Sequence, residues 1–170
     1  MTVIEILSQV INAIGTSLNM IGVNIKNKNK TLIFFTLGNS CIAIALGLLN
    51  ARAGMFVQIT FVLETIINYF WMKKHRLYPL WLIAIYVIVP CTFIISTFGT
   101  IWDIFPMLGA IFFPAACLSK DLRLRILNFF AVVVWIPYDI VFRQYAGMIS
   151  CIIFALVNLA AIIRIDILKK

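Results

Sequence analysis

Basic residues occur in this chain at regular intervals, separated by long apolar runs. Twelve of the fourteen Lys and Arg residues fall into four clusters. The clusters are Lys26, Lys28 and Lys30; Lys73, Lys74 and Arg76; Lys120, Arg123 and Arg125; and Arg164, Lys169 and Lys170. If each apolar run crosses a membrane once, all four clusters lie on one side, and Arg52 and Arg143 lie on the other. Basic residues in short loops stay cytoplasmic, so the pattern predicts seven crossings, with the N-terminus outside and the C-terminus inside.

The composition also indicates a membrane protein. Hydrophobic residues make up 64% of the 170 residues, and charged residues make up only 12%. A soluble domain of this size keeps a large part of its surface exposed and cannot hide that much apolar area. At about 20 residues per crossing, the length accommodates seven helices and no soluble domain. The net charge of +8 is concentrated beside the apolar runs, which favours a topology signal and contact with anionic lipid over nucleic-acid binding.

The apolar runs define the expected helices. They span residues 4–23, 32–50, 53–72, 78–97, 100–117, 124–142 and 145–164. Tight hairpins join the second helix to the third and the sixth to the seventh. Ala53-Gly54-Met55 in the first hairpin recurs 93 positions later as Ala146-Gly147-Met148 in the second. This offset also aligns the basic clusters of the two halves, and together these matches predict an internal repeat.

The repeat predicts the architecture. Residues 1–72 would form one three-helix bundle, residues 73–99 a linker helix, and residues 100–170 a second bundle. Two bundles with the same external hairpin face the membrane the same way only if an odd helix separates them. The expected fold is therefore an all-α integral membrane protein with seven transmembrane helices in a three-plus-one-plus-three parallel repeat. Parallel repeats build transporters with a site at the repeat interface, although duplication alone also produces static membrane proteins.

One face of the third helix is polar through the apolar run. Glu64 lies near its middle, where a carboxylate is costly unless it is paired, protonated or hydrated. At about 100° per residue, Gln58, Thr65 and Asn68 fall on the same face as Glu64. We interpret this face as a cavity wall, with Glu64 as a solute ligand or proton carrier. A hydrogen-bond network between helices is the alternative interpretation.

Three residues of other helices complete the predicted solute site. Asn39, in the middle of the second helix, offers an amide to a ligand or to a neighbouring helix. Trp135, deep in the sixth helix near the kinking Pro137, is a stacking platform or an ordinary packed side chain. Asn158 places a polar group in the second half at a depth close to that of the third-helix stripe. The substrate-binding prediction therefore comprises the following residues: Asn39, Gln58, Glu64, Asn68, Trp135 and Asn158.

Other sequence features are explained without a site. Tyr138 and Asp139 approach the external end of the sixth helix, where ordinary solvation accounts for them. The four cysteines have no paired spacing and are expected to be free thiols. No glycine-rich phosphate loop, His cluster or pair of carboxylates at catalytic spacing is present in the sequence. We therefore expect no enzyme activity, no cofactor and no metal site.

Scattered residues along most of the chain carry a family resemblance. They are Asn39, Gly47, Gly54 and Gln58 in the first half, and Arg125, Trp135, Tyr138, Gly147 and Arg164 in the second. The chain resembles the bacterial YgjV family of inner-membrane proteins and, more distantly, the PnuC-type nicotinamide riboside transporters. These families group with the SWEET sugar transporters, so the resemblance implies two three-helix bundles joined by a linker helix. YgjV-like proteins tend to have a basic residue where Glu64 stands, and the family implies no assigned cargo.

The leading functional hypothesis is facilitated or proton-coupled transport of a small polar solute, such as a vitamin precursor, a nucleoside or a sugar. The alternative is a non-transporting membrane protein that acts through a partner or through lipid. A transporter would line a continuous cavity with the predicted site residues, whereas a scaffold would disperse them among separate interhelical bonds. The expected partners are the solute and the bilayer of the bacterial inner membrane. The cargo, the coupling ion and a homo-oligomeric state stay open.

Overall fold

The computed structural model describes residues 2–23, 28–74, 80–118 and 121–163, and within these ranges the chain forms helices and no strand. In chain order the helices are α1 (Val3–Val23), α2 (Lys28–Leu48), α3 (Arg52–Lys74), α4 (Leu80–Ser96), the short 3-10 helix η1 (Ile101–Asp103), α5 (Ile104–Leu118), α6 (Asp121–Val133), α7 (Trp135–Val141) and α8 (Tyr145–Ala161). The all-helical prediction is confirmed, and each expected helix has a counterpart whose ends lie within four residues of the expected ones.

The sixth expected helix is divided into α6 and α7 at Val134. Pro137 explains the break, because proline has no N–H to donate to the carbonyl four residues earlier, and its ring collides with that carbonyl. The residue concerned is Val133, the last residue of α6. The kink therefore lies one turn before the proline and directly beside Trp135, which begins α7.

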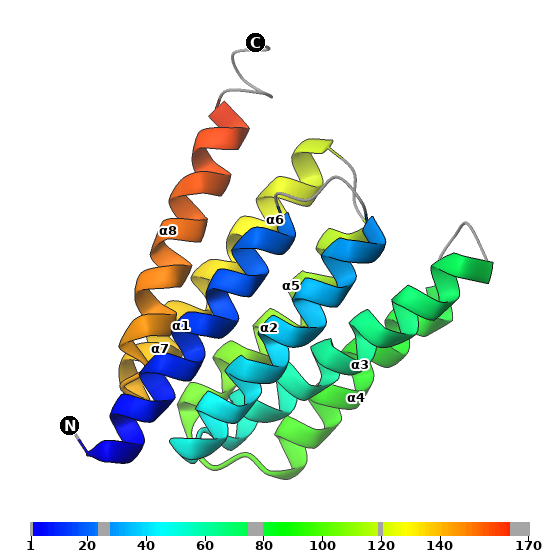
Figure 1. The fold of residues 1–170 in the computed structure, drawn as a ribbon. Coiled ribbons are helices and arrows are strands. Elements are labelled where there is room, and N and C mark those ends of the chain that lie inside the picture. Colours follow the sequence, from blue (N-terminus) through cyan, green and yellow to red (C-terminus); the bar gives the residue numbers. More distant parts are fainter. Residues whose placement is uncertain (1, 24–27, 75–79, 119–120, 164–170) are drawn as a thin grey trace.

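Successive helices run in opposite directions, apart from α6 and α7, which continue in one direction (Figure 1). The N-terminal end of α1, the α2–α3 hairpin and the α7–α8 hairpin lie at one end of the bundle. The C-terminal ends of α1, α3, α5 and α8 lie at the other. We predicted that all four basic clusters lie on one side of the membrane, but the structure describes only some of their residues. The following residues of the clusters lie outside the described ranges: Lys26, Arg76, Lys120, Arg164, Lys169 and Lys170.

The two hairpins close with the same backbone hydrogen bonds at the same offset of 93 residues. After α2, the Ala51 N–H donates to the Leu46 carbonyl at 3.0 Å, and Asn50 N–H donates to Gly47 at 3.1 Å. After α7, Gln144 N–H donates to Asp139 at 2.7 Å, and Arg143 N–H donates to Ile140 at 3.1 Å. Both sets form the Schellman arrangement, which requires a left-handed residue after the helix.

Asn50 and Arg143 are those left-handed residues, with φ angles of 56° and 55°. They are the only non-glycine residues with positive φ in the described part of the chain. A left-handed conformation costs an L-residue about 1–2 kcal/mol, so its occurrence at two matched positions supports a common origin for the hairpins. Superposition of the complete halves stays a prediction.

The helices pack as a closed ring. α1 packs on α2, α2 on α3, α3 on α5, α5 on α6, and α6 and α7 on α8, which returns to α1. α4 lies outside this ring and packs against α3 and α5. The buried core follows the ring's interior, where the buried residues of α2 and α3 meet Trp135 and Tyr138 of α7.

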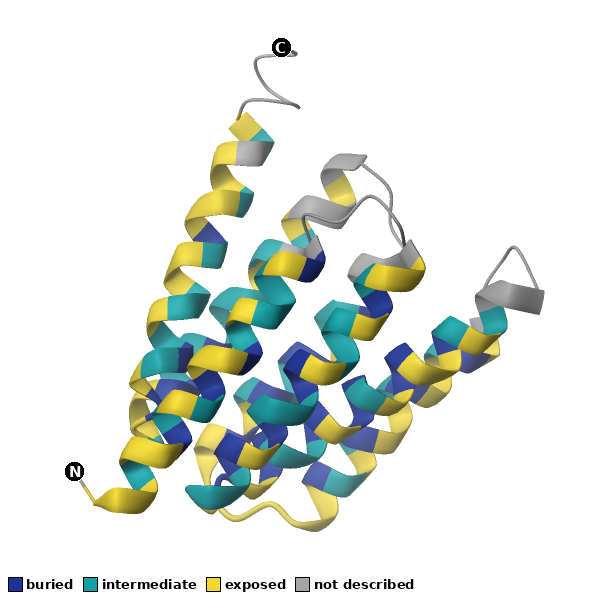
Figure 2. Ribbon diagram, viewed as in Figure 1, coloured by how far each residue is buried: buried dark blue, intermediate teal, exposed yellow. Residues whose placement is uncertain are grey.

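The outer surface of the bundle is apolar. Figure 2 shows exposed residues along the outward faces of the helices, and these include large side chains such as Ile88, Ile95 and Leu156, each at least 60% exposed. Within the described ranges, Asn29–Leu48 and Arg52–Trp71 are long and apolar enough to cross a membrane by length and composition. Four shorter apolar helices accompany them: Trp81–Ser96, Ile101–Ala115, Phe129–Val141 and Tyr145–Ala160. A surface of this kind suits a lipid environment better than water.

Candidate functional site

A cavity of about 560 Å³ lies inside the ring. Its lining residues come from α1, α2, α3, α5, α6, α7 and α8, and none of them comes from α4. Most of the walls are aliphatic or aromatic, and a small set of polar side chains interrupts them. The polar members are Asn12, Thr16, Asn19, Thr31, Asn39, Gln58, Asp139 and Ser150. This pattern of apolar walls with a few converging polar groups is typical of small-molecule sites.

Equivalent positions of the two halves line the cavity in pairs. Twelve of the twenty lining residues pair at the offset of 93. The pairs are Met20 with Phe113, Asn39 with Val132, Ile42 with Trp135, Leu46 with Asp139, Gln58 with Cys151, and Phe61 with Phe154. Both halves of the sequence therefore contribute to the cavity, at the offset that the predicted repeat gives. The chemistry of the cavity is nevertheless asymmetric, because no pair has a strongly polar residue in both places.

Buried amide groups in the cavity have unused hydrogen-bonding capacity. Asn12 is 1% exposed and Gln58 is 7% exposed. The side-chain oxygens of Asn12, Asn19 and Gln58 have no hydrogen-bond partner in the described structure. Asn19 does donate from its amide nitrogen to the Asn39 oxygen at 2.9 Å. A buried acceptor without a partner costs about 1–3 kcal/mol, so these three side chains leave unsatisfied polar groups beside one cavity.

Asp139 is a member of the cavity that the sequence interpretation missed. The residue is only 4% exposed, and its carboxylate accepts a weak hydrogen bond from the Cys151 thiol at 3.9 Å. Solvation at the helix end was therefore the wrong explanation for Asp139, and it was also wrong for Tyr138. Tyr138 is fully buried, and its hydroxyl accepts a hydrogen bond from the Gly54 N–H at 2.9 Å. The offset of 93 could have indicated that Asp139 is buried, because the residue at the matching position in the first half is the apolar Leu46.

Gly147 permits close packing beside Asp139. A Cβ atom at Gly147 would lie 2.7 Å from an Asp139 carboxylate oxygen and 2.9 Å from the Asn12 amide nitrogen. The bare backbone of α8 therefore lies directly against two polar groups from α1 and α7. This contact makes the first turn of α8 a wall of the cavity.

The structure divides the six predicted site residues into two groups. Asn39, Gln58 and Trp135 line the cavity, whereas Glu64, Asn68 and Asn158 are not among its lining residues. Asn68 accepts a hydrogen bond from the Tyr86 hydroxyl of α4 at 3.2 Å. Asn158 donates to the Phe154 carbonyl of its own helix at 3.1 Å.

The predicted polar face of α3 does not act as one wall. Gln58 faces the cavity, whereas the Thr65 hydroxyl lies 2.9 Å from the Thr36 hydroxyl of α2. Asn68 contacts α4, and Glu64, which is 3% exposed, is buried away from the cavity lining. The face therefore combines both sequence hypotheses. One part lines a cavity, and another part forms bonds between helices.

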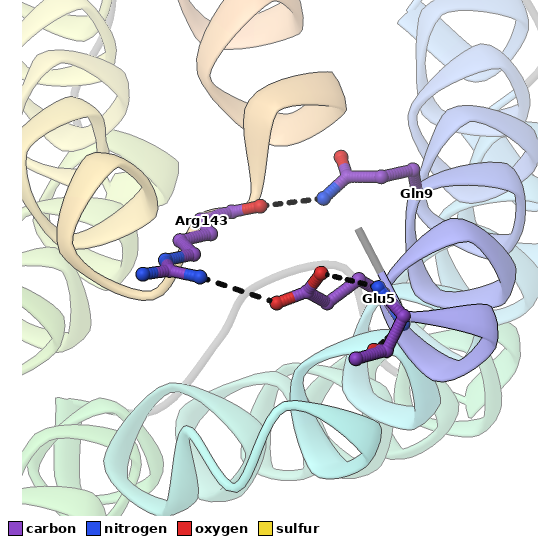
Figure 3. A network of polar contacts seen from close by, with 4 residues as sticks. Glu5, Gln9 and Arg143 are labelled. Atoms are coloured by element: carbon purple, nitrogen blue, oxygen red, sulfur yellow. Dashed lines mark hydrogen bonds and ion pairs between the residues drawn. The ribbon is translucent and has the colours of Figure 1, made fainter.

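Polar contacts at the N-terminal end of α1 join it to the neighbouring helices at that end of the bundle. Gln9 accepts a hydrogen bond from the Ala146 N–H at 2.7 Å. It also donates to the Arg143 carbonyl at 2.5 Å, and the Glu5 carboxylate lies 3.5 Å from the Arg143 guanidinium (Figure 3). The buried Ser8 hydroxyl donates to the Ala45 carbonyl of α2 at 2.8 Å and accepts from the Gln144 amide at 3.1 Å.

These end contacts tie α1 to α2 and to the α7–α8 hairpin. The cavity lining reaches in the opposite direction, to Met20 near the end of α1 and to Thr31 in the first turn of α2. The cavity therefore extends toward the bundle end that the basic clusters flank in sequence, and the end contacts separate it from the other bundle end.

The chain matches a known protein family. The family model Imp-YgjV, described as a bacterial inner membrane protein, matches residues 6–169. No curated protein matches the chain, and no solved structure matches it. The predicted resemblance to YgjV proteins is confirmed, whereas a relationship to PnuC-type and SWEET transporters stays a prediction.

Proposed function

This chain belongs to the YgjV family of bacterial inner membrane proteins, and we propose that it moves a small polar solute across that membrane, by facilitated or proton-coupled transport. The supporting observation is the 560 Å³ cavity between the two halves, which is lined by amide side chains whose buried oxygens have no partner among the described residues. A purely structural bundle would be more stable if these oxygens had hydrogen-bond donors or were replaced by apolar groups. A transporter keeps the oxygens free to bind its solute.

The proposed topology follows from the ring and the charge pattern together. Seven helical segments cross the bilayer, so that the N-terminus is outside and the C-terminus is cytoplasmic. The end contacts of Glu5, Gln9 and Arg143 then lie on the outer side. The cavity extends toward the cytoplasmic side, as expected for one state of an alternating-access cycle. The matched lining positions support a site at the interface of a parallel repeat.

A scaffold that acts through a partner or through lipid is the second candidate. The bond between Tyr86 and Asn68 and the contact between Thr36 and Thr65 favour it, because they are ordinary interhelical bonds. Similar bonds join Asn19 to Asn39 and Ser150 to Thr16 among the residues that line the cavity. They leave the side-chain oxygens of Asn12, Asn19 and Gln58 without a partner among the described residues, and transport therefore remains our proposal.

Uptake into proteoliposomes tests the proposal. Purified protein is reconstituted and exposed to a panel of labelled small metabolites that includes nucleosides, vitamin precursors, sugars and amines. We expect saturable uptake of at least one class, which Gln58→Leu reduces and which empty liposomes lack. Uptake no faster than in empty liposomes across the whole panel would favour the scaffold.

Glu64→Gln is expected to leave solute affinity within about twofold of the wild type, because Glu64 is outside the cavity lining and an amide of the same shape preserves its packing. The same variant reports on coupling. Loss of the pH dependence of uptake identifies Glu64 as the proton carrier, whereas an unchanged pH dependence identifies facilitated transport or another carrier. The measurement is the initial uptake rate against solute concentration at several pH values. A strong loss of affinity in Glu64→Gln would contradict the placement of the site.

A further inference from the structure

We propose that the transported solute is a compact organic cation that donates hydrogen bonds, held by Asp139 together with the unpartnered amides. The inference rests on the proposed transport function and names the substrate class of the same cavity. It begins from the charge of the lining. Asp139 contributes a carboxylate, and no Lys, Arg or His is among the described residues that line the cavity. Within the described lining, an anionic solute would therefore meet a carboxylate and no positive charge.

The Asp139 carboxylate is placed to receive such a ligand. It is 4% exposed, and its one hydrogen bond in the described structure comes from the Cys151 thiol at 3.9 Å, which is a weak donor. A buried carboxylate is stabilised chiefly by a nearby cation and by strong donors. The described residues supply neither, so a solute with a positively charged N–H group is the natural partner.

The neighbouring amides favour the same chemistry. Asn12 and Gln58 are more than nine-tenths buried, and the side-chain oxygen of each has no donor among the described residues. Asn12 also lies beside Asp139, since the same missing Cβ of Gly147 would touch both side chains. A solute with several N–H groups can therefore bond to Asp139 and to an adjacent amide together. A solute that only accepts hydrogen bonds would leave all of these oxygens unpaired.

The remaining walls indicate the body of the cation. Trp135, Phe61, Phe113 and Phe154 line the cavity, and the ring centroids of Phe61 and Phe113 lie 4.6 Å apart. Aromatic walls bind an apolar or aromatic body and also attract a positive charge over a ring face. The class is thus a small aromatic or alkyl cation that carries an amidinium, guanidinium or primary ammonium group.

Three compounds of nearly equal shape test the class. Benzamidinium is a cation with N–H donors, benzamide is its neutral analogue, and benzoate is the corresponding anion. Their binding to the purified full-length protein in lipid nanodiscs is measured by calorimetric titration at pH 7. We expect benzamidinium to bind about tenfold or more tightly than benzamide, as one additional charge-assisted hydrogen bond predicts, and benzoate to bind most weakly.

Two carboxylate variants provide the matched comparison. Asp139→Asn should remove most of the preference for benzamidinium, whereas Glu64→Gln, which changes the buried carboxylate outside the lining, should keep it. The order of affinities in the wild type is decisive even if Asp139→Asn does not fold. Equal binding of benzamide and benzamidinium, preferred binding of benzoate, or no binding of benzamidinium would overturn the cation class.

The titration and the uptake panel separate the two proposals. Binding without preference for the cation, together with uptake of a neutral solute, would remove the cation class and leave transport intact. Preferred binding of benzamidinium without uptake of any panel member would support the class and remove the transport function.

Discussion

Gly147→Ala is expected to reduce solute uptake by about tenfold or more, with the protein still inserted and folded. The added Cβ would lie within 3.0 Å of both an Asp139 oxygen and the Asn12 nitrogen, and both side chains are buried with little room to move. One of them must therefore shift away from the cavity. Displacement of a charge-assisted hydrogen bond costs about 1.5 kcal/mol or more, which corresponds to about a tenfold loss of affinity.

Gly47→Ala is the matched control for this prediction. Its Cβ would lie 3.0 Å from the sulfur of Met55, the end of a flexible side chain that adapts at low cost. Gly47 is also helical, where alanine is favoured by up to about 1 kcal/mol. We expect Gly47→Ala to transport like the wild type. Initial uptake rates, normalised to folded protein, compare the two variants, and normal uptake by Gly147→Ala would show that solute does not pass along this wall.

Gln58→Met is expected to lower uptake by about tenfold while the stability stays constant or rises. The Gln58 oxygen is buried in the cavity without a partner, so its replacement by an apolar side chain of similar size removes an unsatisfied group rather than a bond. Relief of such a group is worth about 1–3 kcal/mol. The solute loses an amide contact by the same change, and stability and function therefore move in opposite directions.

Gln9→Met provides the opposite case. Gln9 uses both ends of its amide, toward the Ala146 N–H and the Arg143 carbonyl. Removal of that amide takes the partner from the part-buried Ala146 N–H and from the exposed Arg143 carbonyl, and it should lower the free energy of unfolding by about 1 kcal/mol. Thermal unfolding in detergent, measured beside uptake, distinguishes the two glutamines. A Gln58→Met protein less stable than Gln9→Met would mean that Gln58 serves the structure and not the solute.

The helices were predictable because long apolar runs leave few alternatives. The repeat of Ala-Gly-Met identified both hairpins, and the structure adds the same Schellman bonds around Asn50 and Arg143. The arrangement of the helices around the cavity was not predictable in this way. The polar stripe shows which residues of α3 share one face, but it does not show what that face contacts, because α3 packs against α2, α4 and α5. Only packing determines that Gln58 meets the cavity and that Asn68 meets α4.

The burial of Asp139 was also not predictable from the sequence around it. Its place near the end of a predicted helix suggested contact with water, because depth along one helix was the only guide. In the structure, α1 covers that end through Ser8 and Gln9, which bond to the α7–α8 hairpin. Burial at a helix end therefore depends on a partner more than 130 residues distant in sequence. The repeat offset carried more information about this position than local hydropathy did.

Access to Cys151 tests transport through this cavity without knowledge of the cargo. Cys151 lines the cavity, and a variant in which Cys41, Cys91 and Cys117 are replaced by alanine leaves it as the only thiol in the sequence. The rate of its reaction with a membrane-impermeant maleimide is measured in vesicles of both orientations. Alternating access predicts that Cys151 reacts from either face of the membrane. The reaction should be slower from the outer face, where the end contacts of α1 separate the cavity from solvent. Reaction from one face only, however long the exposure, would contradict transport through the cavity.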